Sequence, residues 1–146
     1  MSQPTIMILI LHLINAGIVV YSDVTRRVIN NYQVLLVLIL GLFTSGVANL
    51  QWGYWAVASI GLLLFFTGVV AGGDIKLLLA YLVGIDSRWW LLVFLLMAII
   101  GGVLALGYLL YGVLINNVQG VRARGLPYGI PIVISGFIGV WLTTIS

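Results

Sequence analysis

The chain has 146 residues, of which 63% are apolar and only 6% are charged, and its net charge is +3. A soluble domain carries about 25% charged residues, so this composition excludes a soluble protein and predicts an integral membrane protein. The basic residues stand in short gaps between apolar runs, where they set orientation in the membrane, so the charge does not indicate nucleic-acid binding. The absence of cysteine excludes disulfides, thiolate metal sites and a cysteine nucleophile. We expect one membrane domain over residues 1–146.

Apolar runs alternate with short polar breaks along the chain. The expected spans are, in order, Pro4–Tyr21, Gln33–Leu50, Tyr54–Ala71, Ile75–Ile85, Trp89–Ile115 and Pro127–Ile145. About 20 helical residues cross the hydrocarbon core, so the run Ile75–Ile85 is ambiguous. It is either a short span or a re-entrant segment.

The basic residues in the polar breaks decide between these two topologies, because short cytoplasmic loops are rich in lysine and arginine. If the short run crosses, one side of the membrane holds Arg26, Arg27, Lys76, Arg122 and Arg124, and Arg88 is alone on the other side. If it does not cross, Arg122 and Arg124 lie outside. We therefore expect an all-α polytopic protein of the inner (plasma) membrane, a bundle of about six transmembrane helices with the fourth short and both termini outside.

Several other residues carry weaker signals. Tryptophan prefers the headgroup level, and an outer aromatic belt is expected from Trp52, Trp55, Trp89, Trp90 and Trp141. Gly68 and Gly72 have the GxxxG spacing of closely packed helices. His12 and Asn15 share a helix face, and hydrogen bonding between helices is favoured over a catalytic role for them.

The acidic residues are the rarest feature of the chain, and Asp74 is the most conspicuous of them. It stands between two apolar runs, where a carboxylate is costly and is therefore a functional candidate. Gly72 and Gly73 precede it and lack a Cβ, so backbone or substrate can come close. The alternative is that Asp74 merely caps the next helix.

Asp23 and Asp74 both fall at cytoplasmic span ends in the expected topology. Two carboxylates at one membrane depth can converge and share a single proton. The neutral member would donate to a carbonyl while the ionised member deprotonates a water, which is the chemistry of an aspartic protease and needs no metal. The alternatives are two unrelated helix caps, or ion pairs with Arg26, Arg27 or Lys76.

Three blocks of the chain resemble motifs of the prepilin peptidase family of intramembrane aspartic proteases, in the order found in that family. Asp23–Asn31 resembles Asp-x-x-x-Arg-x-Ile-Pro-Asn, and Ala71–Lys76 resembles Gly-x-Gly-Asp-x-Lys. Leu126–Pro131 is similar to the Pro-Tyr-Gly block that opens the last span. There are two departures, because Asn30 stands where the family usually has proline and Ala71 where it has the first glycine.

The resemblance implies roles for residues in each block. It implies that Asp23 and Asp74 are the catalytic pair, acting without cofactor or metal. It also implies substrate-binding or supporting roles for Gly72, Gly73, Lys76, Arg27, Asn31, Pro127, Tyr128 and Gly129. For Lys76, anchoring to a lipid phosphate is an equal alternative.

The resemblance is to the short, peptidase-only members, because the chain lacks the cysteine-bearing domain linked to N-methylation. It implies that the partners are the lipid bilayer and a prepilin-like precursor, as for Flp or type IV pilins. The short basic leader of this precursor would be cleaved at the cytoplasmic membrane face, with no methyltransferase activity. The competing class is a non-enzymatic subunit or small transporter of a secretion or pilus system. A transporter would more often place ionisable residues near the bilayer midplane.

Overall fold

The computed structural model describes residues 3–123 and 125–146, and this part of the chain is all-helical. The α-helices are α1 (Gln3–Arg26), α2 (Asn31–Ser45), α3 (Trp52–Phe66), α4 (Gly72–Gly84), α5 (Trp90–Leu114), α6 (Val118–Ala123) and α7 (Gly129–Ile145). A single 3-10 turn, Ser87–Trp89, joins α4 to α5. The predicted all-α class is confirmed.

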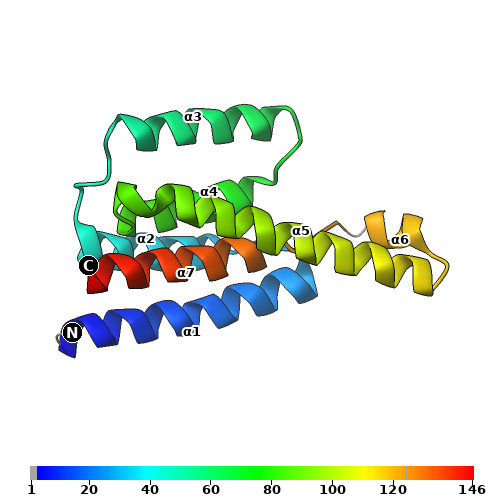
Figure 1. Cartoon of the computed structure of the whole chain (residues 1–146), viewed down its shortest axis with the longest axis horizontal. Helices are drawn as coiled ribbons and strands as arrows, with labels where there is room; N and C mark the ends of the chain where they lie inside the picture. Colours follow the sequence, from blue (N-terminus) through cyan, green and yellow to red (C-terminus); the bar gives the residue numbers. More distant parts are fainter. Residues whose placement is uncertain (1–2, 124) are drawn as a thin grey trace.

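The long helices lie roughly along one axis, and successive ones run in opposite directions (Figure 1). Both termini therefore lie at one end of the bundle, and α6 extends beyond the other end. The turns that lead from α1 to α2, from α3 to α4 and from α6 to α7 lie towards that second end. The residues of the three sequence blocks belong to these turns and to the helix ends beside them.

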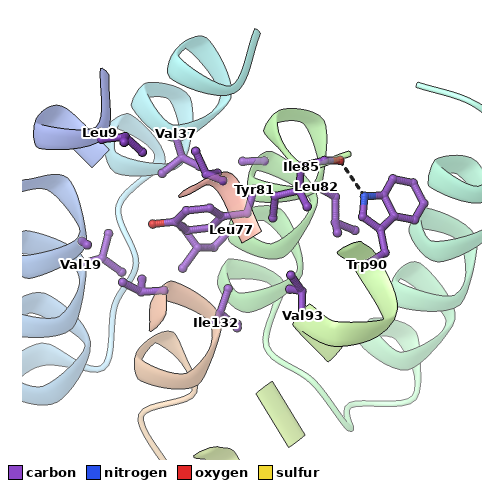
Figure 2. Packing of buried hydrophobic residues seen from close by; sticks show 14 residues of the cluster. Leu9, Val19, Val37, Leu77, Tyr81, Leu82, Ile85, Trp90, Val93 and Ile132 are labelled. Carbon is purple, nitrogen blue, oxygen red and sulfur yellow. Dashed lines mark hydrogen bonds between the residues drawn. The ribbon is translucent and has the colours of Figure 1, made fainter. Parts of the chain in front are cut away.

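Helix α4 lies inside the bundle, where it packs against α2, α3 and α7. Leu77, Tyr81 and Leu82 are fully buried on it. Figure 2 shows Tyr81 and Leu77 in one buried cluster with Val19 of α1 and Ile132 of α7. By contrast, every side chain of α3 is at least partly exposed. The shortest predicted span is thus the most enclosed helix, which its apolar composition did not distinguish from the others.

Glycines let the helices approach closely at several positions, and of the predicted pair this holds for Gly72 but not for Gly68. A Cβ added to Gly84 would lie 2.8 Å from the Cα of Gly41, so α4 and α2 touch through their backbones. On α7, a Cβ on Gly136 would lie 2.6 Å from the Tyr81 ring. The prediction for Gly68 is wrong, because this residue lies beyond the end of α3 at φ +72° with no other atom near its Cβ position.

Two segments of the described chain are long and apolar enough to span a membrane, Gln3–Arg26 and Ser87–Leu114. Shorter apolar helices cover Asn31–Ser45, Trp52–Phe66 and Gly129–Ile145. Helix α4 has 13 residues, and at 1.5 Å per residue it is about 20 Å long. These lengths indicate a membrane protein, and the count of six spans stays a prediction.

The tryptophan belt is wrong at one position. Trp52, at the start of α3, is 90% exposed, as expected for a side chain at the headgroup level. Trp90, however, is buried, and its indole Nε1–H donates to the carbonyl oxygen of Ile85 at 2.9 Å (Figure 2). Its ring packs against α3, 3.1 Å from the Cβ position of Gly53. Burial is possible there because the hydrogen bond to Ile85 satisfies the single donor of the indole.

Of the two polar residues predicted to form hydrogen bonds between helices, Asn15 does so and His12 does not. Asn15 donates from Nδ2 to the backbone carbonyl of Gln33 at 3.1 Å, so its predicted hydrogen bond between helices is confirmed. His12 is fully buried, but neither ring nitrogen has a hydrogen-bond partner among the described residues. Its ring instead stacks on Tyr81, with 5.8 Å between centroids. The predicted hydrogen bond is therefore wrong for His12.

Candidate active site

Asp23 lies in the last turn of α1 and is buried. Its Oδ2 accepts a hydrogen bond of 2.7 Å from the backbone N–H of Gly129, the first residue of α7. The first N–H groups of a helix have no partner within it, and a negative charge is favoured there. The carboxylate of Asp23 thus caps α7 from a different helix, which orients it and stabilises its ionised form.

Gly129 is a glycine because of this contact. A Cβ at this position would lie 2.7 Å from Oδ2 of Asp23. The other two residues of the Pro-Tyr-Gly block, Pro127 and Tyr128, differ in their exposure. Pro127 is buried in the turn before α7, whereas Tyr128 is 47% exposed. Of the three predicted residues in this block, Gly129 is the one that reaches the site.

We predict that Gly129→Ala destabilises the protein by about 1–3 kcal/mol, because the methyl group forces Asp23 and the start of α7 apart. Thermal unfolding in detergent measures the loss. Gly102→Ala on α5 is the matched control, since a Cβ there meets no other atom within 4 Å. If Gly129→Ala and Gly102→Ala proteins are equally stable, the close contact between Gly129 and Asp23 is contradicted.

Asp74 occupies the third position of α4, and Ala71 is the N-cap residue. Its carboxylate makes no hydrogen bond with any described residue, so the alternative that Asp74 caps this helix is wrong. Gly73 directly before it accommodates Ile29, whose Cβ would lie 3.3 Å from a Cβ at position 73. The glycine of the second block thus packs against the first block, which brings the two aspartate-bearing segments together.

The two carboxylates act on each other electrostatically. Asp74 precedes the apolar run Ile75–Ile85 and lies outside the membrane-spanning segments. Burial and, as the smaller cause, the negative charge of Asp23 together raise the pKa of Asp74 to about 6. One proton is therefore held at this pair at a pH where an isolated aspartate has lost it.

The ion-pair alternative is wrong for the described residues, because their single salt bridge joins Arg88 to Asp86 at 3.2 Å. Arg26 and Lys76 are exposed, and Lys76 makes no contact with either aspartate that would be an ion pair. Asn31 is exposed at the start of α2. Predicted roles for Lys76 and Asn31 in the site stay predictions.

The remaining predicted positions are placed as follows. Gly72 faces the Phe65 ring, 3.1 Å from its Cβ position, and so packs α4 against α3. Arg27 forms no ion pair with either aspartate, although its positive charge still acts on Asp23. It donates from Nη2 to the hydroxyl of Tyr108 at 3.3 Å. Arg124 and the side chain of Arg122 lie outside the described residues.

Asn30, which replaces the proline usual in the related motif, uses a group that proline lacks. Its backbone N–H donates to Oε1 of Gln33 at 2.8 Å, and proline has no N–H to donate. Gln33 also bonds to Ser22 of α1 through Nε2 at 3.2 Å. This network fixes the turn that follows Asp23. Neither Gln33 nor Tyr108 was predicted, because both stand in apolar runs without a local motif.

The fold and the site define a helical protein with apolar helices and two interacting carboxylates at one end of its bundle. The model of the type IV leader peptidase family matches residues 7–106, and the chain therefore belongs to this family of peptidases. The matched region contains Asp23 and Asp74 and ends before Gly129. Comparisons with curated proteins and with solved structures returned no match.

Proposed function

We propose that this protein is a membrane-embedded aspartic endopeptidase that removes the short basic leader of prepilin-like precursors at the cytoplasmic membrane face. The observation that carries the proposal is the electrostatic coupling of Asp23 and Asp74 at one end of the bundle. Family membership supports the peptidase activity. The position of both carboxylates at helix ends, away from the middle of the bundle, counts against a transporter.

The two carboxylates are assigned different tasks in this proposal. The N–H of Gly129 orients the carboxylate of Asp23 and favours its ionised form, so Asp23 is assigned the acceptance of a proton from the attacking water. Asp74 keeps its proton and donates it to the oxygen of the scissile carbonyl as the tetrahedral intermediate forms. When the peptide bond breaks, the proton taken from water passes from Asp23 to the leaving amine. Asp74 takes back a proton from a hydroxyl of the intermediate as the carboxylic acid product forms, and the pair returns to its singly protonated state.

The proposed topology has six spans with both termini outside, and the alternating helix directions support it (Figure 1). Because the chain has no cysteine, single cysteines can be probed with a membrane-impermeant thiol reagent. Cysteines at positions 25, 73 and 120 should label only from the cytoplasmic side, and those at 52 and 87 only from outside. Outside labelling at position 120 would mean that α4 does not cross.

Purified protein incubated with a prepilin precursor tests the proposed activity. With a chelator present and no methyl donor, mass spectrometry should detect a product shortened by the leader and carrying an unmethylated amino terminus. The Asp74→Asn protein, purified in parallel, controls for contaminating peptidases. An unprocessed precursor would favour a non-enzymatic membrane subunit. Loss of cleavage on chelation, restored by zinc, would count against the aspartic mechanism.

A further inference from the structure

Arg27 has a conformation and an environment that its place in the first sequence block does not explain. It follows the last residue of α1 and has φ 55°, a left-handed conformation that is uncommon for a residue with a side chain. This turn carries the guanidinium across to α5, where it lies 5.7 Å from the centroid of the Tyr108 ring. Its Nη2 donates to the Tyr108 hydroxyl.

The guanidinium is only partly satisfied by these contacts. Its Nη1 is buried and has no hydrogen-bond partner among the described residues. Arg27 is also not part of an ion pair in the described part of the chain. A buried cationic donor without an acceptor is costly, so an acceptor from outside the chain is the natural complement of this group.

A cavity of about 330 Å³ lies directly beside the guanidinium. Its lining comes from the ends of α1 and α5 and from α6, and consists of Val24, Arg27, Tyr108, Tyr111 and Val121. Arg27 is the charged member of this set, and the other described lining residues are apolar or aromatic. The wall combines polar and apolar surface in similar amounts, which suits a ligand that joins an anionic group to an apolar chain.

The cavity lies where such ligands occur. It is at the end of the bundle opposite both termini, near the turn after α1 and beside α6 (Figure 1). Apolar helices end at this level, and tyrosine is enriched where hydrocarbon meets the headgroups. Tyr111 is 56% exposed at this edge, and Val24 is 43% exposed. The open side of the cavity therefore faces lipid headgroups when the helices lie in a membrane.

We propose that the cavity formed by α1, α5 and α6 binds the phosphate of an anionic phospholipid, with Arg27 as the anchoring residue. A guanidinium binds phosphate by charge-assisted hydrogen bonds, and a rotation of the Arg27 side chain would bring the buried, unpartnered Nη1–H to the phosphate oxygens. The acyl chains leave along the apolar side chains of Val24 and Val121. This proposal rests on the membrane placement of the helices and does not depend on the proposed peptidase activity.

Native mass spectrometry of the intact protein in detergent tests the proposal directly. Phosphatidylglycerol, phosphatidylcholine and glycerol 3-phosphate are added separately, which distinguishes an anionic lipid from a zwitterionic lipid and from a free phosphate. We expect phosphatidylglycerol to bind at least about tenfold more tightly than the other two. Equal binding of the two lipids, or equal binding of glycerol 3-phosphate, would overturn the proposal.

Substitutions locate the site. Arg27→Gln should reduce phosphatidylglycerol affinity by about tenfold or more. The matched control Arg26→Gln removes the same charge from an exposed neighbour and should change it less than about threefold. Val121→Phe fills the cavity while Arg27 keeps its charge, and it should also weaken binding. An equal effect of the two arginine variants, or unchanged binding in a folded Val121→Phe protein, would show that the cavity is not the site.

Discussion

Asp23→Asn and Asp74→Asn should each abolish leader cleavage while the protein stays in the membrane at its normal level. Asparagine has nearly the same shape as aspartate, but it can neither release a proton to the substrate nor accept one from water. Each variant thus removes one half of a single proton-transfer step, and general acid–base catalysis alone contributes about 10²–10⁴-fold. Cleavage of a co-expressed precursor, followed by its shift on a gel, measures the effect.

Loss of stability would not explain such a result. Asp23→Asn leaves a side-chain oxygen that can still accept from the N–H of Gly129, so the cost is that of a charge-assisted bond becoming neutral, about 1 kcal/mol. The internal control is Asp86→Asn. Asp86 caps the 3-10 turn at the opposite end and pairs with Arg88 in an exposed salt bridge, which contributes about 0–1 kcal/mol. Its variant should cleave normally.

The pH dependence of cleavage should follow the proton on Asp74. The pKa of Asp74 is raised to about 6 by burial and by the charge of Asp23, so the singly protonated pair predominates below this pH and is lost above it. The value of kcat/KM should therefore fall as pH rises above about 6, by about tenfold for each further pH unit. The profile is measured with purified protein and a precursor whose own charge is constant over this range.

An infrared measurement assigns this proton to its residue. The carbonyl stretch of a protonated carboxylic acid should titrate with the descending limb of the rate profile and should be missing in Asp74→Asn. In Asp23→Asn the charge that raises the pKa of Asp74 is gone, so the same band should titrate at lower pH. A band that titrates identically in wild type and Asp23→Asn would mean that the carboxylates are not coupled.

Composition and spacing predicted the all-helical class and most helix positions, because apolar runs and polar breaks are local properties of the sequence. They did not predict which helix is most enclosed. The short run at α4 looked marginal, yet it is the most enclosed helix. The backbone contact between Gly41 and Gly84 depends on two segments meeting in space, and no periodicity within either segment encodes it.

In the candidate site, too, local features were predictable from the sequence and contacts between distant segments were not. Asp23 and Asp74 were visible as rare charges at the ends of apolar runs. The bond between Asp23 and Gly129 joins positions 106 residues apart, and only the resemblance of the third block indicated that Gly129 belongs to the site. Tyr108 and the cavity beside Arg27 were not predicted, because a tyrosine near the end of an apolar run has no distinguishing local pattern.

The most direct test of the central claim, that Asp23 and Asp74 act as one catalytic unit, is the residual cleavage rate of the Asp23→Asn/Asp74→Asn double variant beside both single variants. Residues that share one catalytic step are strongly non-additive, so the double variant should cleave within about threefold of either single variant. Independent roles would instead multiply the two losses. Substantial cleavage by a folded Asp23→Asn protein would contradict the shared mechanism outright.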